Sequence, residues 1–195
     1  MAEYGRRGVV GMSLANGAAL VLGGCASAQE DRSRSGATPT SDGRFASFTE
    51  YVPDKLEIRT DLGRLDRRMP GVTISSAHWV AQYWQEEREL LPPQDRPIWV
   101  HGVLALEPAS TRALAKASSG MADPLPGIYP DLHQYVPEGK VFTTVPKEKA
   151  EEILDVKHMM RDDPNAHGSD GVGVDQAAVC ADANLLILMA NEYIF

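Results

Sequence analysis

The sequence predicts an α+β protein with a single folded domain, built from a mostly antiparallel sheet of about five strands with two helices on one face. Three observations lead to this prediction. Short runs rich in β-branched and apolar residues recur after residue 48, Pro and Gly clusters separate these runs, and two segments have the apolar spacing of amphipathic helices. We expect this domain to occupy residues 49–195.

The first part of the domain contains one short strand and one ambiguous segment. Residues 55–60 alternate between polar and apolar side chains, as a strand does. Residues 72–84 fit either a strand or a helix. The β-branched start of this segment favours a strand, whereas the polar and charged residues 85–89 favour a helix. We expect a strand that runs into a charged connection.

The middle of the domain contains the clearest interior strand. Residues 98–106 form a nearly continuous apolar run, which is typical of a strand buried on both faces. Pro108 can occupy the first turn of a helix, and Gly120 is a suitable end for it. Residues 121–130 contain three prolines and one glycine, so they are expected to form a loop.

The last part of the domain predicts two more elements and a hairpin. Residues 141–144 are expected to form a short strand, followed by a helix that starts at Pro146. Residues 172–180 and 185–193 are apolar and β-branched, and Ala-Asp-Ala-Asn at 181–184 separates them. This arrangement is typical of a β-hairpin.

The first 24 residues have the three parts of an export signal. Arg6-Arg7 provides a charged start, residues 8–22 are mainly apolar, and two glycines precede Cys25. The apolar run is shorter than the roughly 20 residues that span a bilayer, and Gly and Asn dilute it. A signal peptide at residues 1–24 is therefore favoured over a transmembrane helix.

The sequence Leu22-Gly23-Gly24-Cys25 resembles the lipobox of bacterial lipoproteins. The resemblance implies that Cys25 becomes the new N-terminus and carries lipid on its sulfur, which would anchor the chain to the cell membrane on its extracytoplasmic face. Arg6-Arg7-Gly8-Val9-Val10 is also similar to a twin-arginine export signal. Ordinary signal-peptide charge explains these arginines equally well, so the export route stays open. The polar residues 25–48 are expected to form a flexible tether.

Charge and cysteine content restrict the partners and the source of stability. The net charge is −8 and the acidic residues are spread out, which argues against a nucleic-acid partner and against electrostatic attachment to anionic lipids. If Cys25 carries lipid, Cys180 has no partner for an internal disulfide. Cys180 lies in an apolar segment, so we expect a buried thiol in a domain stabilised by its core.

Two histidines suggest a candidate ligand pocket. His78 and His101 lie on neighbouring expected strands. Trp79 directly follows His78, and Trp99 lies two positions before His101. The four side chains could converge on a small ligand, and with Tyr83 and Trp84 the tryptophans could line a carbohydrate or peptide groove. Histidines and aromatics at strand spacing more often belong to the core, and we favour that interpretation.

A polar loop over residues 157–171 provides candidate metal ligands, namely His158, Asp163, His167 and Asp170. Carboxylates and imidazoles can bind a divalent cation. Their spacing matches neither an EF-hand loop nor a His-Glu-x-x-His helix. A solvated loop is the favoured interpretation, and we expect no metal and no cofactor.

The sequence contains no Gly-x-Ser-x-Gly, no Ser-x-x-Lys and no phosphate-binding glycine loop. We therefore expect a non-enzymatic binding or interaction module of the cell envelope, with an envelope protein or a small ligand as its partner. The alternative is a hydrolase of envelope material that uses a metal or general acid/base catalysis. Such an enzyme would use the polar region between residues 158 and 175.

Overall fold

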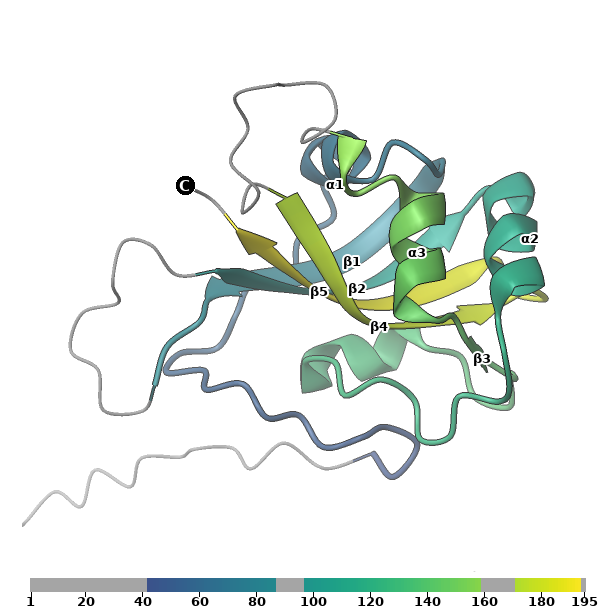
Figure 1. Cartoon of the computed structure of the whole chain (residues 1–195). Coiled ribbons are helices and arrows are strands. Elements are labelled where there is room, and N and C mark those ends of the chain that lie inside the picture. Colours follow the sequence, from purple (N-terminus) through teal and green to yellow (C-terminus); the bar gives the residue numbers. More distant parts are fainter. Residues whose placement is uncertain (1–41, 87–96, 159–170, 194–195) are drawn as a thin grey trace, which may run out of the picture. The chain divides into compact units, whose positions relative to one another are not determined.

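A computed structural model of the chain describes residues 42–86, 97–158 and 171–193, all within the compact unit Thr38–Phe195. They form one five-stranded antiparallel sheet in the order β1-β2-β5-β4-β3 (Figure 1). The strands are β1 Ile74–Tyr83, β2 Ile98–Leu106, β3 Thr143–Thr144, β4 Gly171–Cys180 and β5 Leu185–Tyr193. The α+β class and the antiparallel sheet expected from the sequence are confirmed.

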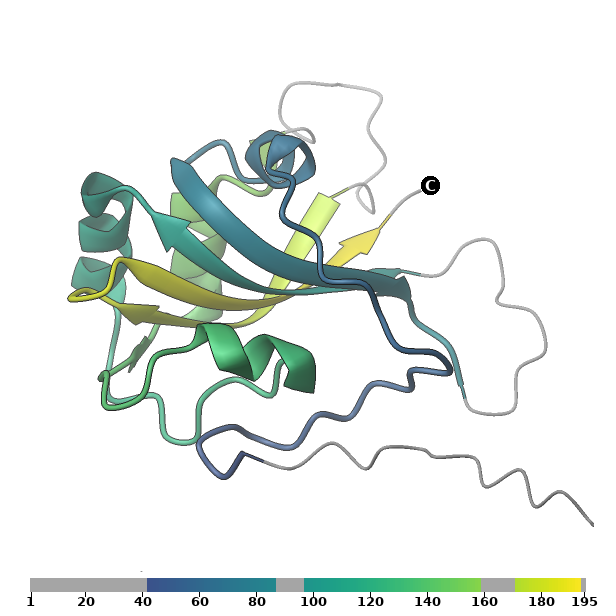
Figure 2. The same cartoon turned by 180° about the vertical axis from the view of Figure 1, so that it is seen from behind.

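The two faces of the sheet have different coverings. Helices α1 (Gly63–Arg68), α2 (Pro108–Ala117) and α3 (Lys147–Leu154) lie on one face, and the 3-10 helix η1 (Pro130–Tyr135) lies on the other (Figures 1 and 2). The extended segment at residues 42–60 also crosses the η1 face. Phe45 is buried there and forms a bridge with Leu125, and Phe48 packs against the same core. The expected boundary between a tether at 25–48 and a domain at 49–195 is therefore wrong, since these apolar side chains make residues 42–48 part of the folded domain. Because side chains alternate along each strand, the sheet contributes to a separate core on each side.

The central strands are the most deeply buried. Eight of the nine residues of β2 are buried, and β2 lies between β1 and β5 as expected for the apolar run at 98–106. The β4–β5 hairpin is also confirmed, with Asn184 in the left-handed region at a φ of 53°. Asn tolerates this conformation better than most residues, and its carbonyl accepts a hydrogen bond of 2.8 Å from the Leu106 amide.

The ambiguous segment at residues 72–84 contains the strand β1, Ile74–Tyr83, as the sequence favoured. Residues 55–60 differ from expectation, because they make a single bridge between Arg59 and Trp79 rather than a strand. Their alternation reflects partial burial of Leu56 and Ile58 on the η1 face. An extended segment that lies over the sheet can therefore alternate between polar and apolar residues without forming the continuous hydrogen bonds of a strand.

Both expected helices are present, starting at Pro108 and directly after Pro146. The sequence left α1 unassigned and missed η1, because each has only six residues and therefore less than two full turns of an α-helix. Within the described ranges, no helix combines the length and apolar character that crossing a bilayer requires.

A β-bulge interrupts β4 between Val174 and Gln176. The amide of Val174 donates a hydrogen bond of 3.2 Å to Oε1 of Glu151, a buried side chain of α3. The other oxygen of Glu151 pairs with Lys157 at 2.7 Å. Helix α3 therefore supports the bulge, which projects Asp175 from the sheet.

Candidate functional site

His78, His101 and Trp99 share the face of the sheet that η1 covers. His101 lies opposite Val80 in the register, and His78 lies two pairs further along, opposite Val103. The Trp99 and His101 rings are 4.8 Å apart, centroid to centroid. The structure therefore brings three of the four residues of the predicted pocket onto one face.

Trp79 lies on the opposite face, among the residues of the helix-side core. It precedes Val80 and follows His78, and successive strand residues point to opposite faces. Its indole Nε1 donates a hydrogen bond of 2.9 Å to the carbonyl of Asp61. Trp79 therefore does not line the candidate pocket with the other three residues, because it lies in the core on the other side of the sheet.

His101 is a core residue, with only 2 % of its surface exposed. Its Nδ1 accepts a hydrogen bond of 3.1 Å from the Tyr129 amide, so the neutral ring carries its proton on Nε2. Burial lowers the pKa of His101 to about 4. The neutral imidazole connects β2 to the loop that leads into η1.

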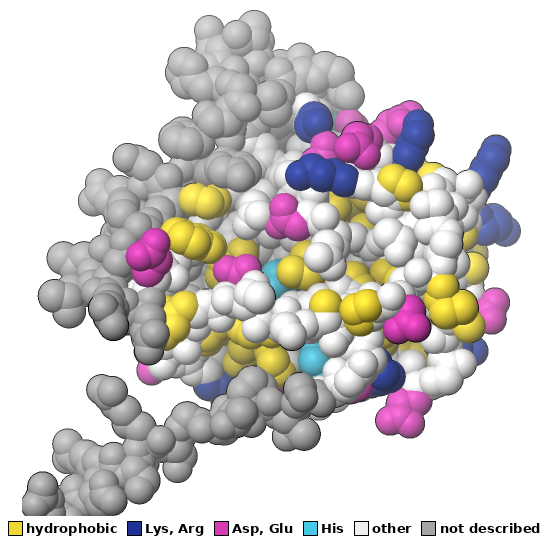
Figure 3. Space-filling model, turned by 60° about the horizontal axis from the view of Figure 1, so that its bottom comes forward, with side chains coloured by type: hydrophobic (Ala, Val, Ile, Leu, Met, Phe, Trp, Pro, Cys, Tyr) yellow, Lys and Arg dark blue, Asp and Glu magenta, His cyan; other side chains and the backbone are white. Residues whose placement is uncertain are grey.

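The other histidines in the described ranges also have packing contacts. His78 stacks on Tyr135 at 3.6 Å, and His133 stacks on Phe45 at 3.7 Å, so both rings help to hold η1 in place. The histidines that reach the surface on this face lie among hydrophobic side chains (Figure 3). His158 contacts the Asp155 carbonyl through Nδ1 at 2.8 Å.

Three of the four candidate metal ligands, Asp163, His167 and Asp170, lie outside the described residues, as does Cys25. In the part of the chain that the structure describes, no group of three or more His, Cys, Asp or Glu side chains could hold a metal ion. Cys180 is a buried free thiol, as expected.

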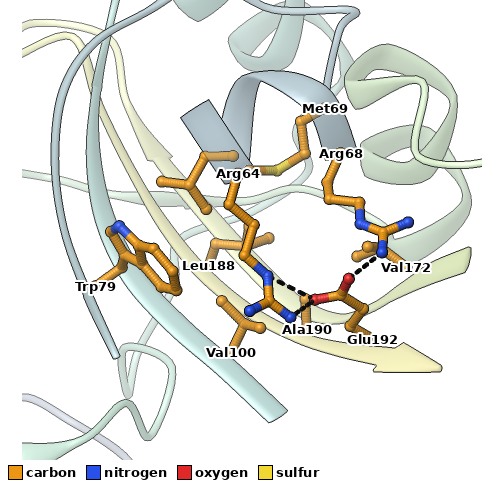
Figure 4. Close-up of a pocket in the computed structure, with 10 residues that line it drawn as sticks. Arg64, Arg68, Met69, Trp79, Val100, Val172, Leu188, Ala190 and Glu192 are labelled. Carbon is orange, nitrogen blue, oxygen red and sulfur yellow. Dashed lines mark hydrogen bonds and ion pairs between the residues drawn. The ribbon is translucent and has the colours of Figure 1, made fainter. Parts of the chain in front are cut away.

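A buried acid that the sequence interpretation missed lies beneath α1. Glu192 of β5 is 1 % exposed and pairs with two arginines that lie one helical turn apart, Arg64 and Arg68 (Figure 4). Arg64 donates through Nε to Glu192 Oε2 at 3.0 Å, and Arg68 forms an ion pair with Oε1. The two arginine side chains remain 33 % and 24 % exposed. This cluster fastens α1 to the end of β5.

The cavity beside this cluster is apolar and small. It has a volume of about 20 Å³, which is room for about one water molecule. Its apolar walls come from α1, the sheet and the residue after α1: Leu65, Met69, Trp79, Val100, Val172, Leu188 and Ala190.

The sequence contains a signal for the burial of Glu192. Glu192 follows Leu188 and Ala190 at every second position of β5, so strand alternation could have placed it on the buried face.

Exposed aromatic residues lie at the C-terminal end of β1. We call Tyr51, Tyr83 and Trp84 the aromatic end of β1; they are 37 %, 48 % and 41 % exposed. Gln82 Nε2 donates a hydrogen bond of 3.0 Å to the Tyr51 carbonyl, which places that segment beside the strand. The other two tryptophans, Trp79 and Trp99, are buried core residues.

A second, larger pocket of about 190 Å³ opens where β3 separates from β4. Three prolines form part of its wall, at positions 124, 126 and 146. Lys147 and Asp175 contribute unlike charges to its lining.

No protein-family model, no curated protein and no solved structure matches this chain. The functional proposal below therefore rests on the sequence and on the arrangement of the described side chains.

Proposed function

We propose that this chain is a lipid-anchored lipoprotein on the extracytoplasmic face of the cell membrane, and that its folded domain is a non-enzymatic binding module. The lipobox resemblance at Leu22-Gly23-Gly24-Cys25 supports the anchor. The polar residues 26–41 that follow would separate the domain from the membrane, because residues 42–48 already pack on the folded domain. The partner is an envelope protein or a small ligand.

The observation that carries the binding role is the aromatic end of β1. Tyr and Trp combine a large apolar surface with a polar group, and they are enriched at the centres of protein interfaces. Trp84 and Tyr83 each expose more than two fifths of their surface, although the neighbouring strand residues Val80 and Trp79 are fully packed. Exposed aromatics grouped at one end of a sheet favour an interaction surface.

The three histidines on the η1 side of the sheet also support binding rather than acid–base catalysis. The rings of His78 and His133 are stacked on aromatic neighbours, and His101 is buried against Tyr129 and Trp99. These contacts give each ring a role in holding η1 and its flanking loop on the sheet.

Site-specific photocrosslinking in membranes of the producing cells tests this proposal. A photoreactive phenylalanine analogue replaces Tyr83 or, as a matched control, the 67 % exposed Met121 near β3. We expect a discrete crosslinked product from position 83 and none from position 121. The partner identified from that product should bind the purified chain, and Trp84→Ser should weaken its affinity about tenfold, the effect of losing ~1.4 kcal/mol.

The control substitution Met121→Ser should leave that affinity unchanged. Equal crosslinking from positions 83 and 121, or equal affinity of the Trp84→Ser and Met121→Ser variants, would contradict the proposed surface. Circular dichroism of each variant establishes that the fold is retained.

A further inference from the structure

The pocket where β3 separates from β4 has a lining unlike that of the small cavity under α1. Its volume is about 190 Å³, and it is formed by three segments: 122–126, 144–147 and 175–178. Pro124, Pro126 and Pro146 each have a fixed backbone φ, so this part of the wall is stiff. A stiff wall lowers the entropy lost when a ligand binds.

The bulge in β4 gives this pocket its acidic group. Asp175 lies at the irregularity between Val174 and Gln176, where two residues of β4 face one residue of β5. Asn191 donates a hydrogen bond to Asp175 Oδ2 through its amide. Among the described residues no donor reaches Oδ1, which leaves one carboxylate oxygen available to a ligand.

Lys147 gives the pocket its basic group. The two other lysines near α3 have carboxylate partners, since Lys149 pairs with Glu152 at 2.8 Å and Lys157 pairs with Glu151 at 2.7 Å. Desolvation raises the pKa of Asp175, and the charge of Lys147 offsets part of this rise, but the two groups form no direct ion pair. Each is therefore able to pair with an opposite charge placed between them.

We infer that this pocket binds a small zwitterion of the amino-acid type, with the ligand's ammonium group on Asp175 and its carboxylate on Lys147. Charge-assisted hydrogen bonds of this kind are stronger than neutral ones, and two of them at fixed positions select a ligand that carries both charges. The apolar wall formed by the prolines, Val145, Ala177 and Ala178 suits a small aliphatic side chain.

The electrostatic surroundings agree with an ammonium group beside Asp175. Desolvation raises the pKa of Asp175, and the nearby Glu151 raises it further. Desolvation and the charge of Asp175 also raise the pKa of Glu50. A bound cation would offset the repulsion among these carboxylates.

The test is titration of the ¹⁵N-labelled full chain, followed by NMR, with three probes: L-alanine, ethylamine and propionate. Ethylamine carries only the cationic group and propionate only the anionic one. We expect L-alanine to shift the amides of Thr144 and Gln176 and to bind at least about tenfold more tightly than either single-charge probe. Equal affinities for all three probes would overturn the inference.

Variants assign each charge to its partner. Asp175→Asn should weaken L-alanine binding about tenfold and abolish ethylamine binding, while propionate binding stays unchanged. Lys147→Met should abolish propionate binding and leave ethylamine binding unchanged. Lys149→Met is the matched control, because its partner Glu152 lies outside the pocket, and it should have no effect.

Trp84→Ser separates this site from the proposed interaction surface and should leave L-alanine binding intact. If neither Asp175→Asn nor Lys147→Met changes the affinity for L-alanine, the pocket is not its binding site. Both side chains are solvent-exposed, so these variants are expected to fold, which thermal unfolding checks.

Discussion

Glu192 loses nearly all of its hydration in the folded chain, and two arginines of α1 compensate its charge. A buried ion without a partner is strongly destabilising, whereas a partly exposed arginine that loses its partner can regain water. The cost of breaking this cluster therefore depends on which side is removed.

We expect the double variant Arg64→Ala/Arg68→Ala to lower the free energy of unfolding by about 3–5 kcal/mol, because it leaves the carboxylate buried and unpaired. Glu192→Gln should cost less, about 1–2 kcal/mol, since the arginines are 33 % and 24 % exposed. Urea unfolding measures both values. A larger loss of unfolding free energy for Glu192→Gln than for the double variant would contradict this prediction, because it would mean that the unpaired arginines are costlier than the unpaired carboxylate.

His101 is expected to make stability depend on pH. Its pKa is about 4 in the folded chain, compared with an ordinary value of 6.5, so between these values the unfolded chain binds a proton that the folded chain does not. The stability due to neutral His101 is complete above pH 6.5 and is lost as the pH falls toward 4, by up to about 3 kcal/mol.

Comparison with His101→Gln isolates this contribution, because Gln can still accept the Tyr129 hydrogen bond but does not titrate. Partial burial lowers the pKa of His133, which also makes the folded chain less stable as the pH falls. The raised pKa values of Glu50 and Asp175 have the opposite effect and make it more stable as the pH falls. The stability difference between the wild type and the variant should shrink from pH 7 to pH 4. An NMR titration midpoint of His101 near 6.5 would contradict this prediction.

At the scale of elements, Gly71 sets the distance between the segment before β1 and the end of α3. Its amide donates a hydrogen bond of 3.1 Å to the Leu154 carbonyl, and a Cβ at this position would overlap the backbone oxygen of Ile153. Backbone atoms cannot move aside as a flexible side chain does. Gly71→Ala should therefore cost about 3 kcal/mol, at the upper end for overpacking.

Gly63→Ala is the matched control. Gly63 is the first residue of α1, and a Cβ there meets nothing within 4 Å. Because Ala loses less conformational entropy than Gly in a helix, we expect this variant to be neutral or more stable by up to ~1 kcal/mol. Thermal unfolding of both variants checks the prediction, and similar melting temperatures would contradict it.

At the scale of the whole molecule, attachment to the membrane is expected to depend on Cys25. The chain has a net charge of −8, which does not favour binding to anionic lipid head groups. A lipid on Cys25 would supply the affinity that the protein surface does not. Cys25→Ser should therefore move the chain from the membrane fraction to the soluble fraction.

Fractionation followed by immunoblotting measures this change. Cys180→Ala is the matched control, since Cys180 is the other cysteine and is buried in the fold. This variant should remain in the membrane fraction. Retention of Cys25→Ser in carbonate-washed membranes would contradict lipid anchoring.

The sequence alone was sufficient for the α+β class, for the strands β2, β4 and β5, and for the helices that follow Pro108 and Pro146. For β1 it favoured a strand but left a helix open. It also predicted the turn at 181–184 and the burial of Cys180. These features follow from hydrophobic periodicity and from local turn and capping residues, all of which act over a few neighbouring positions.

Only the tertiary structure decided which residues meet. Trp79 and Trp99 each lie within two positions of a histidine in the sequence. Strand alternation and register nevertheless place the two tryptophans in different cores. Arg64 and Glu192 are 128 positions apart, and three distant segments form the proline-walled pocket. Local patterns determine the elements and their buried faces, whereas contacts between distant elements depend on the strand order and on the helices or loops that cover each face.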